Sequence, residues 1–357
     1  MKKLFVLLLA LAVVAGAFAQ VTTSVTLSGS MFLENSRGDG ETVMYLGPDG
    51  STYDTLKLKA SKDGKFGFEL YEKNVLSAIA IDNWTVWYDV GFAKFTFGVL
   101  DGGSYVQYFN NGWLENYTPT DNIDRGLLIE SKDFGGLKLA VFLDGDAMPA
   151  AAANADVQGF VDIREYLKKS VIGASYTIED MATILFQYNL GLTEEGVSDE
   201  SNVNLGFNFT GVENLDTYGW VNYDFTGSGT LAGGIGGQYK TSTFRAGAEF
   251  EMQSADDVLA FDVVGNFRYY VMPTLWLQAR VDYSNENTMY TDVNTTPVTM
   301  AAYGEGRVRA RTYVNYAFGN GFAVEAMVGY DTLPIVRLEA WDAALINYIR
   351  FVYSVSF

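Results

Sequence analysis

A period-two alternation of apolar and polar residues recurs along most of this chain and limits the folds that it can adopt. Near the N-terminus, Leu27, Met31 and Leu33 alternate with smaller or polar residues, and the pattern returns in segments such as 203–209 and 322–330. Alternation at every second position places apolar and polar side chains on opposite faces of a β-strand. No helical period competes over a comparable length, so the sequence predicts an all-β protein.

The N-terminus has the three parts of a secretory signal peptide. Lys2 and Lys3 provide the positive start, residues 4–14 form an apolar run, and Ala17-Phe18-Ala19 fits the cleavage rule of small residues flanking any residue. A membrane anchor is the alternative, but the run is short of the roughly 20 residues of a spanning helix. We therefore expect residues 1–19 to be removed and residues 20–357 to form one exported domain.

The apolar strand faces could meet inside a soluble periplasmic sandwich or point outward toward lipid. Strands of about 10 residues match the span of a tilted transmembrane strand. Aromatic residues gather near strand ends, at 223–225, 267–270 and 313–318, where interfacial girdles lie in membrane barrels. These observations favour a transmembrane antiparallel up-and-down β-barrel over the sandwich.

The connections between the strands alternate between short turns and longer, acidic loops, which is typical of outer-membrane barrels. The expected short turns are 61–64, 90–91, 132–136, 179–180, 211–214, 240–242, 272–274 and 319–321. The expected loops are 35–52, 73–82, 101–124, 144–168, 191–201, 226–230, 253–257, 285–302 and 332–345. These eight turns and nine loops predict 18 strands, and two weaker hairpins leave 16 as the alternative.

The most specific motif is the last strand, in which alternate residues on one face are apolar or aromatic and the chain ends on an aromatic residue. The residues of this face are Phe351, Tyr353, Val355 and Phe357. Here the sequence resembles bacterial outer-membrane barrels, whose terminal strand ends in Phe. The resemblance implies that these four residues are an assembly signal for the barrel-assembly machinery. It also implies an outer-membrane location, in contact with the lipid bilayer and lipopolysaccharide or an equivalent outer leaflet.

A barrel of 16 to 18 strands leaves an aqueous channel, so the resemblance narrows to porins of that size. It implies passive diffusion of small hydrophilic solutes and ions, a homotrimer, and a third external loop that narrows the pore. The candidate loop is 101–124, whose acidic residues are Asp101, Glu115, Asp121 and Asp124. The motif of the family's third loop is not recognisable here, so this assignment rests on order and length. The alternative is an external loop packed on its neighbours or on another protomer.

The sequence also contains basic residues for the barrel wall that would face this loop. They are arginines concentrated late in the chain. The pore-lining candidates are Arg245, Arg268, Arg280, Arg307, Arg309, Arg311 and Arg350. A row such as Arg307, Arg309 and Arg311 shares one strand face and is too costly toward lipid, so it must face the lumen. Inward acids could instead neutralise the row; the candidates are Glu249, Glu251, Asp262, Asp282 and Glu325. Lys57, Lys59 and Lys94 are weaker inward candidates on early strands.

Composition limits the functions that remain. The chain has no histidine and no cysteine, so we expect no enzyme, no cofactor and no metal site. Its net charge of −19 argues against a nucleic-acid partner. A substrate-specific channel stays open as an alternative because Trp87, Trp220 and Trp276 fall on inward positions, where they could form a slide for solutes. A surface adhesin or antigen that uses the long loops is the third possibility.

Overall fold

The structure is a computed structural model. The described residues are 21–35, 43–46, 55–62, 65–73, 83–99, 125–144, 170–190, 192–193, 196–197, 201–225, 231–255, 258–285, 306–332 and 344–356. Within these ranges, no helix has the length and apolar character needed to cross a membrane. The expected signal peptide, residues 1–19, lies outside them.

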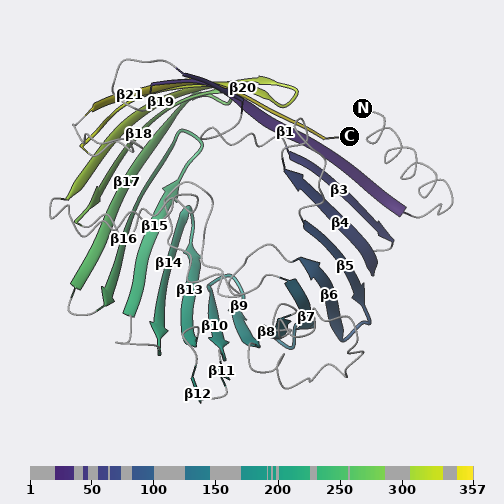
Figure 1. Cartoon of the computed structure of the whole chain (residues 1–357). Coiled ribbons are helices and arrows are strands. Elements are labelled where there is room, and N and C mark those ends of the chain that lie inside the picture. The colour runs from purple at the N-terminus through teal and green to yellow at the C-terminus, as the bar shows by residue number, and fades with distance from the viewer. Residues whose placement is uncertain are drawn as a thin grey trace, which may run out of the picture.

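The described chain forms one antiparallel β-barrel whose strands pair in sequence order (Figure 1). Eighteen strands make up the ring, the higher of the two predicted numbers. The first half of the ring contains β1 (Val21–Asn35), β3 (Thr55–Lys62), β4 (Phe66–Lys73), β5 (Asn83–Asp89), β6 (Ala93–Val99), β7 (Arg125–Ser131), β8 (Leu137–Asp144), β9 (Val171–Ile178) and β10 (Ala182–Asn189). The second half contains β13 (Asn202–Val212), β14 (Leu215–Asp224), β15 (Leu231–Lys240), β16 (Phe244–Ala255), β17 (Val258–Met272), β18 (Leu275–Ser284), β19 (Arg307–Gly319), β20 (Phe322–Asp331) and β21 (Ala344–Ser356).

The ring closes between its first and last strands. β1 and β21 are antiparallel and in continuous register from Thr26 opposite Ser356 to Asn35 opposite Asn347. This seam includes three residues of the predicted terminal motif, with Val355 opposite Leu27, Tyr353 opposite Gly29 and Phe351 opposite Met31. The last residue, Phe357, lies outside the described part of the chain. Full closure removes the exposed edges that an open sheet would have.

Burial in this barrel is inverted relative to a soluble protein. Gln187 and Asn204 are completely buried, whereas Ile235 and Val328 are 58% and 62% exposed. Most large apolar side chains of the strands point out of the ring, and most polar side chains point into it. An outward apolar face is stable only against lipid or detergent, so the soluble sandwich is excluded.

Short turns join the strands at one rim, as predicted from glycine, asparagine and aspartate. Only Asn320 and Gly321 separate β19 from β20, and both have positive φ angles, of 53° and 81°. That is the geometry of a type I′ hairpin turn, which asparagine and glycine adopt at low cost. Asp180 and Asn214 take the same left-handed conformation in two neighbouring turns, with φ angles of 56° and 65°.

Several of the predicted loops were too long. The predicted loop 35–52 contains the short strand β2 (Val43–Leu46), which pairs with the C-terminal part of β1. It lies on the same edge of β1 with which β3 pairs nearer the N-terminus. The predicted loop 253–257 is mostly strand, because β16 continues to Ala255 and β17 begins at Val258. Both segments lie toward the long-loop rim, where alternation fades. The predicted loop 191–201 also contains a two-stranded sheet of β11 (Leu192–Thr193) and β12 (Gly196–Val197).

The glycine-rich strand β15 gives space to bulky residues on β14. Gly234 lies opposite Trp220 and Gly236 lies opposite Tyr218, and both aromatic side chains are buried. A Cβ atom on Gly234 would lie 2.7 Å from the Trp220 Nε1 atom. Aromatic rings therefore cover the backbone where glycine leaves the inner wall open.

Candidate functional site: the inner wall of the barrel

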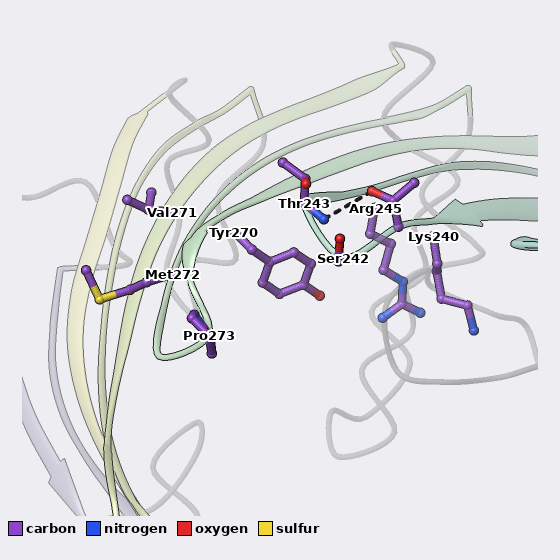
Figure 2. A pocket seen from close by; sticks show the side chains of 9 residues that line it. Lys240, Ser242, Thr243, Arg245, Tyr270, Val271, Met272 and Pro273 are labelled. Carbon is purple, nitrogen blue, oxygen red and sulfur yellow. Dashed lines mark hydrogen bonds between the residues drawn. The ribbon is translucent and has the colours of Figure 1, made fainter.

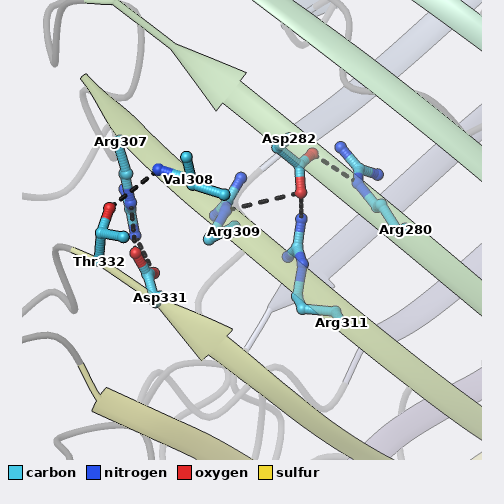
Figure 3. A network of polar contacts seen from close by, with 8 residues as sticks. All are labelled: Arg280, Asp282, Arg307, Val308, Arg309, Arg311, Asp331 and Thr332. Carbon is cyan, nitrogen blue, oxygen red and sulfur yellow. Dashed lines mark hydrogen bonds and ion pairs between the residues drawn. The ribbon is translucent and has the colours of Figure 1, made fainter.

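The structure places all seven predicted arginines on the polar face of late strands. Most of these side chains take part in ion pairs, and their role in lining a pore stays a prediction. Figure 3 shows five charged side chains of β18 and β19, together with Asp331 and Thr332. Arg307 donates from Nε to the Oδ1 atom of Asp331 over 2.9 Å and also bonds Oδ2 through Nη2. This bidentate geometry matches the planar guanidinium to one carboxylate.

Three other arginines converge on one carboxylate. Asp282 lies 2.7 Å from Nε of Arg280, 2.6 Å from Nη2 of Arg311 and 3.8 Å from Nε of Arg309. The arginine side chains are only 9–14% exposed and the aspartate side chain is 2% exposed. We call these four residues the Asp282 cluster. It combines three positive charges with one negative charge in a largely dehydrated part of the wall.

Of the remaining arginines, Arg350 forms an ion pair, whereas Arg245 and Arg268 bond to glutamine side chains. Arg350 lies 2.9 Å from Glu325, which also accepts a hydrogen bond from the Tyr348 hydroxyl. Arg268 donates from Nε and Nη2 to the side-chain oxygen of Gln278, and Arg245 donates from Nε to that of Gln238. The two glutamine contacts orient the guanidinium groups. The alternation pattern could not identify these glutamine partners, because cross-strand register decides them.

The more exposed cations of the wall are lysines. Lys57 and Lys59 flank Glu69 at 2.6 and 3.6 Å, and their side chains are 48% and 50% exposed. Lys94 lies 3.7 Å from Glu130 and is 47% exposed. Sequence reasoning ranked these lysines below the arginines, but side-chain exposure ranks them above. Burial is a property of the folded wall that the alternation pattern does not encode.

An uncharged polar sector, which the sequence analysis did not single out, covers β10, β13 and β14. Its buried amide side chains are Gln187, Asn189, Asn202, Asn204 and Asn222. They are linked by hydrogen bonds, including Asn189 to Asn202 at 2.7 Å and Asn222 to Asn204 at 2.5 Å. The available signal was the spacing of Asn202 and Asn204, which places two amides on one strand face.

The three inward tryptophans do not form one continuous surface. Trp87 lies on β5 with Lys59 5.5 Å from its ring, Trp220 is buried against β15, and Trp276 on β18 stacks under the Arg268 guanidinium at 4.0 Å. Their inward orientation agrees with the prediction. They lie on three separate strands of the described wall, β5, β14 and β18.

The candidate constriction loop, 101–124, lies outside the described residues, and so do its acids Asp101, Glu115, Asp121 and Asp124. The same holds for the assembly-signal residue Phe357. Among the described strands and turns, no group of three or more acidic side chains is arranged to hold a metal ion.

Comparison with solved structures identifies the fold. No family model and no curated protein sequence matches the chain. The fold is similar to that of OccK2 (OpdF) from Pseudomonas aeruginosa, with a TM-score of 0.59 and 11% identity over 95% of this chain and 99% of the other. OccK11 (OpdR) from the same organism gives 0.57 and 12% over 95% and 97%. OccAB3 from Acinetobacter baumannii gives 0.54 and 12% over 95% and 100%. This chain therefore has the fold of outer-membrane porins.

Proposed function

We propose that this chain is an outer-membrane porin, which forms a water-filled channel for passive diffusion of small hydrophilic solutes and ions. The observation that carries the proposal is the inverted burial of a closed 18-stranded barrel, with an apolar exterior and a polar interior wall. A barrel of this size is too wide for its own wall side chains to fill. The short-turn rim then faces the periplasm and the long loops face outward.

Conductance in a planar bilayer tests this proposal. Purified protein that shows heat-modifiable migration on a gel, and is therefore folded, is expected to insert and produce discrete current steps. The size cutoff for neutral solutes measures how wide the pore is. Folded protein that gives no steps under any voltage or salt condition would contradict the channel.

A substrate-selective channel is the second candidate. It is supported by the division of the wall into a late arginine sector, a buried amide sector and an early lysine sector, and by the fold shared with the Occ and Opd porins. A selective channel would show current block that saturates with one class of solute. A general porin would show conductance that follows bulk conductivity for all small ions.

We propose that the Asp282 cluster contributes to the electric field inside the pore, because it gathers three guanidinium groups on one stretch of the inner wall. Replacing Arg309 and Arg311 by Gln is expected to shift the reversal potential toward cation selectivity in a salt gradient. Thr312→Val, on the outward face of the same strand, is the matched control. An unchanged reversal potential in folded double-mutant channels would remove the filter role.

Assembly partners follow from the same proposal. We infer that the terminal strand is recognised by the barrel-assembly machinery and that the barrel contacts lipid and the outer leaflet. A homotrimer is expected from the resemblance to general porins, and chemical cross-linking in mild detergent tests it.

An adhesive role would belong to the long loops. Loop deletions that abolish surface binding and preserve conductance would support that role.

A further inference from the structure

A pocket of about 520 Å³ opens at the short-turn rim between two hairpins (Figure 2). It is lined by residues 240–243 and 270–273 and by Arg245. Figure 2 shows the polar ends of Lys240, Arg245 and Tyr270 directed into one space, with Ser242 at its edge. The two cations and the tyrosine lie on the inward face of β15, β16 and β17, so the pocket belongs to the mouth of the barrel and not to its lipid-facing side.

Cations occupy directly opposed positions on three adjacent strands next to this pocket. Lys240 pairs in register with Arg245, and Arg245 pairs in register with Arg268. Directly opposed side chains in an antiparallel sheet have Cβ atoms about 5 Å apart, and like charges at such positions are destabilising. Asp216 on β14 lies 2.6 Å from Lys240. Three cationic side chains and one carboxylate therefore meet at this mouth.

The surrounding contacts hold the cations in place. The Thr241 hydroxyl accepts hydrogen bonds from the backbone N–H groups of Thr243 and Phe244, which fixes the turn. Gln238 accepts from Nε of Arg245 at 2.6 Å, and this contact orients the guanidinium group. Ser242 and Tyr270 add hydroxyl groups that can donate to an oxygen ligand. A pre-organised set of two cations and two hydroxyls suits an anion with several oxygens.

We propose that this pocket, which we call the rim site, binds a small multivalent oxyanion such as inorganic phosphate or a short dicarboxylate. Lys240 and Arg245 contact the anion directly, and Arg268 adds to the potential from the neighbouring strand. Only the route by which the anion arrives, through the pore mouth, rests on the proposed channel. The chemistry of the site stands on the pocket and its cations.

Calorimetric titration of inorganic phosphate into the purified full chain tests the rim site, in a phosphate-free non-ionic detergent at low salt. Wild-type protein is expected to bind phosphate more tightly than acetate, because acetate carries one charge. Lys240→Gln and Arg245→Gln should each weaken phosphate binding about tenfold, the loss expected for one charge-assisted contact. The matched control is Lys138→Gln, an exposed inward lysine at the same rim, which lies opposite Ser175 and should bind phosphate as the wild type does.

Heat-modifiable migration verifies that each variant is folded. The second variant keeps the test valid if the first one fails to fold. Folded wild type that binds no phosphate would overturn the rim site, as would equal binding by wild type and both rim variants. Conductance of the same preparations separates this inference from the channel. Current steps without phosphate binding refute the rim site alone, whereas phosphate binding without current steps refutes the channel alone.

Discussion

Trp220 and Gly234 form a pair in which one residue fills the space that the other leaves. Gly234→Ala is expected to destabilise the barrel by about 1–3 kcal/mol, because the added methyl group overlaps a buried indole ring. Gly265→Ala is the matched control, since no heavy atom lies within 4 Å of the added Cβ. The temperature at which gel migration changes measures both variants, and an equal shift would contradict the packing argument.

Replacing Asp282 is expected to lower stability more than the glycine substitution does, because three buried arginines contact its carboxylate. Asp282→Asn should lower stability by about 3–5 kcal/mol, the cost of leaving buried charge without its partner. Glu130→Gln is the contrasting change, since the Lys94–Glu130 pair is well exposed and should contribute no more than about 1 kcal/mol. Denaturant-induced unfolding in detergent, followed by tryptophan fluorescence, would measure the difference. Similar losses in both variants would show that the Asp282 cluster is not energetically special.

At the residue scale, the sequence could predict which face a side chain occupies but not which side chain it meets. The i, i+2, i+4 spacing placed Arg307, Arg309 and Arg311 together on the inner wall. It could not show that Asp331 binds the first, whereas Asp282 serves the other two. Those partners come from neighbouring strands, so they depend on register. The role of the acids in 101–124 stays a prediction, because that segment lies outside the described residues.

The individual hairpin is the next scale, and the Asn320–Gly321 turn shows how local chemistry fixes it. Gly321→Val should destabilise the β19–β20 hairpin by about 1–3 kcal/mol, because a β-branched residue is strained at a φ angle of 81°. Asn320→Gly should have little effect, since glycine adopts the same conformation freely. Thermal unfolding compares the two variants, and a neutral Gly321→Val would argue against a type I′ turn here.

Strand ends were harder to predict than strand identities. In the hairpin of β16 and β17, Gln253, Ser254 and Ala255 continue the ladder opposite Ala260, Leu259 and Val258. Their composition reads as a loop because a hairpin that rises above the lipid is wet on both faces, so its outward side need not be apolar. The apolar alternation therefore marks the membrane-facing part of a strand and not its full hydrogen-bonded length.

For the whole molecule, closure by β21 should be indispensable. Deleting residues 344–357 would leave one edge of β1 and one edge of β20 unpaired, and no heat-modifiable species is expected after refolding into detergent. Phe357→Ala is the informative comparison. It should refold normally with purified components but accumulate less in cells if the terminal residue is an assembly signal. Normal accumulation in cells would remove that role.

The count of 18 strands was predictable because each turn and loop has its own composition, and a ring with both termini on one side requires an even number. The arrangement of β1, β2 and β3 was not predictable, because it depends on one edge being shared. The ladder between β3 and β1 ends with Thr55, the first residue of β3, opposite Ser28, and β2 resumes the same edge with Leu46 opposite Met31.

This shared edge makes the second wall strand discontinuous in sequence yet nearly continuous in space. The neighbours of β1 are kept although residues 47–54 intervene between Leu46 and Thr55. Peptides grafted at this point would lengthen the chain without shifting any other strand. Because β2 and β3 share one edge of β1, insertions between them would enlarge the protein without changing the ring of strands.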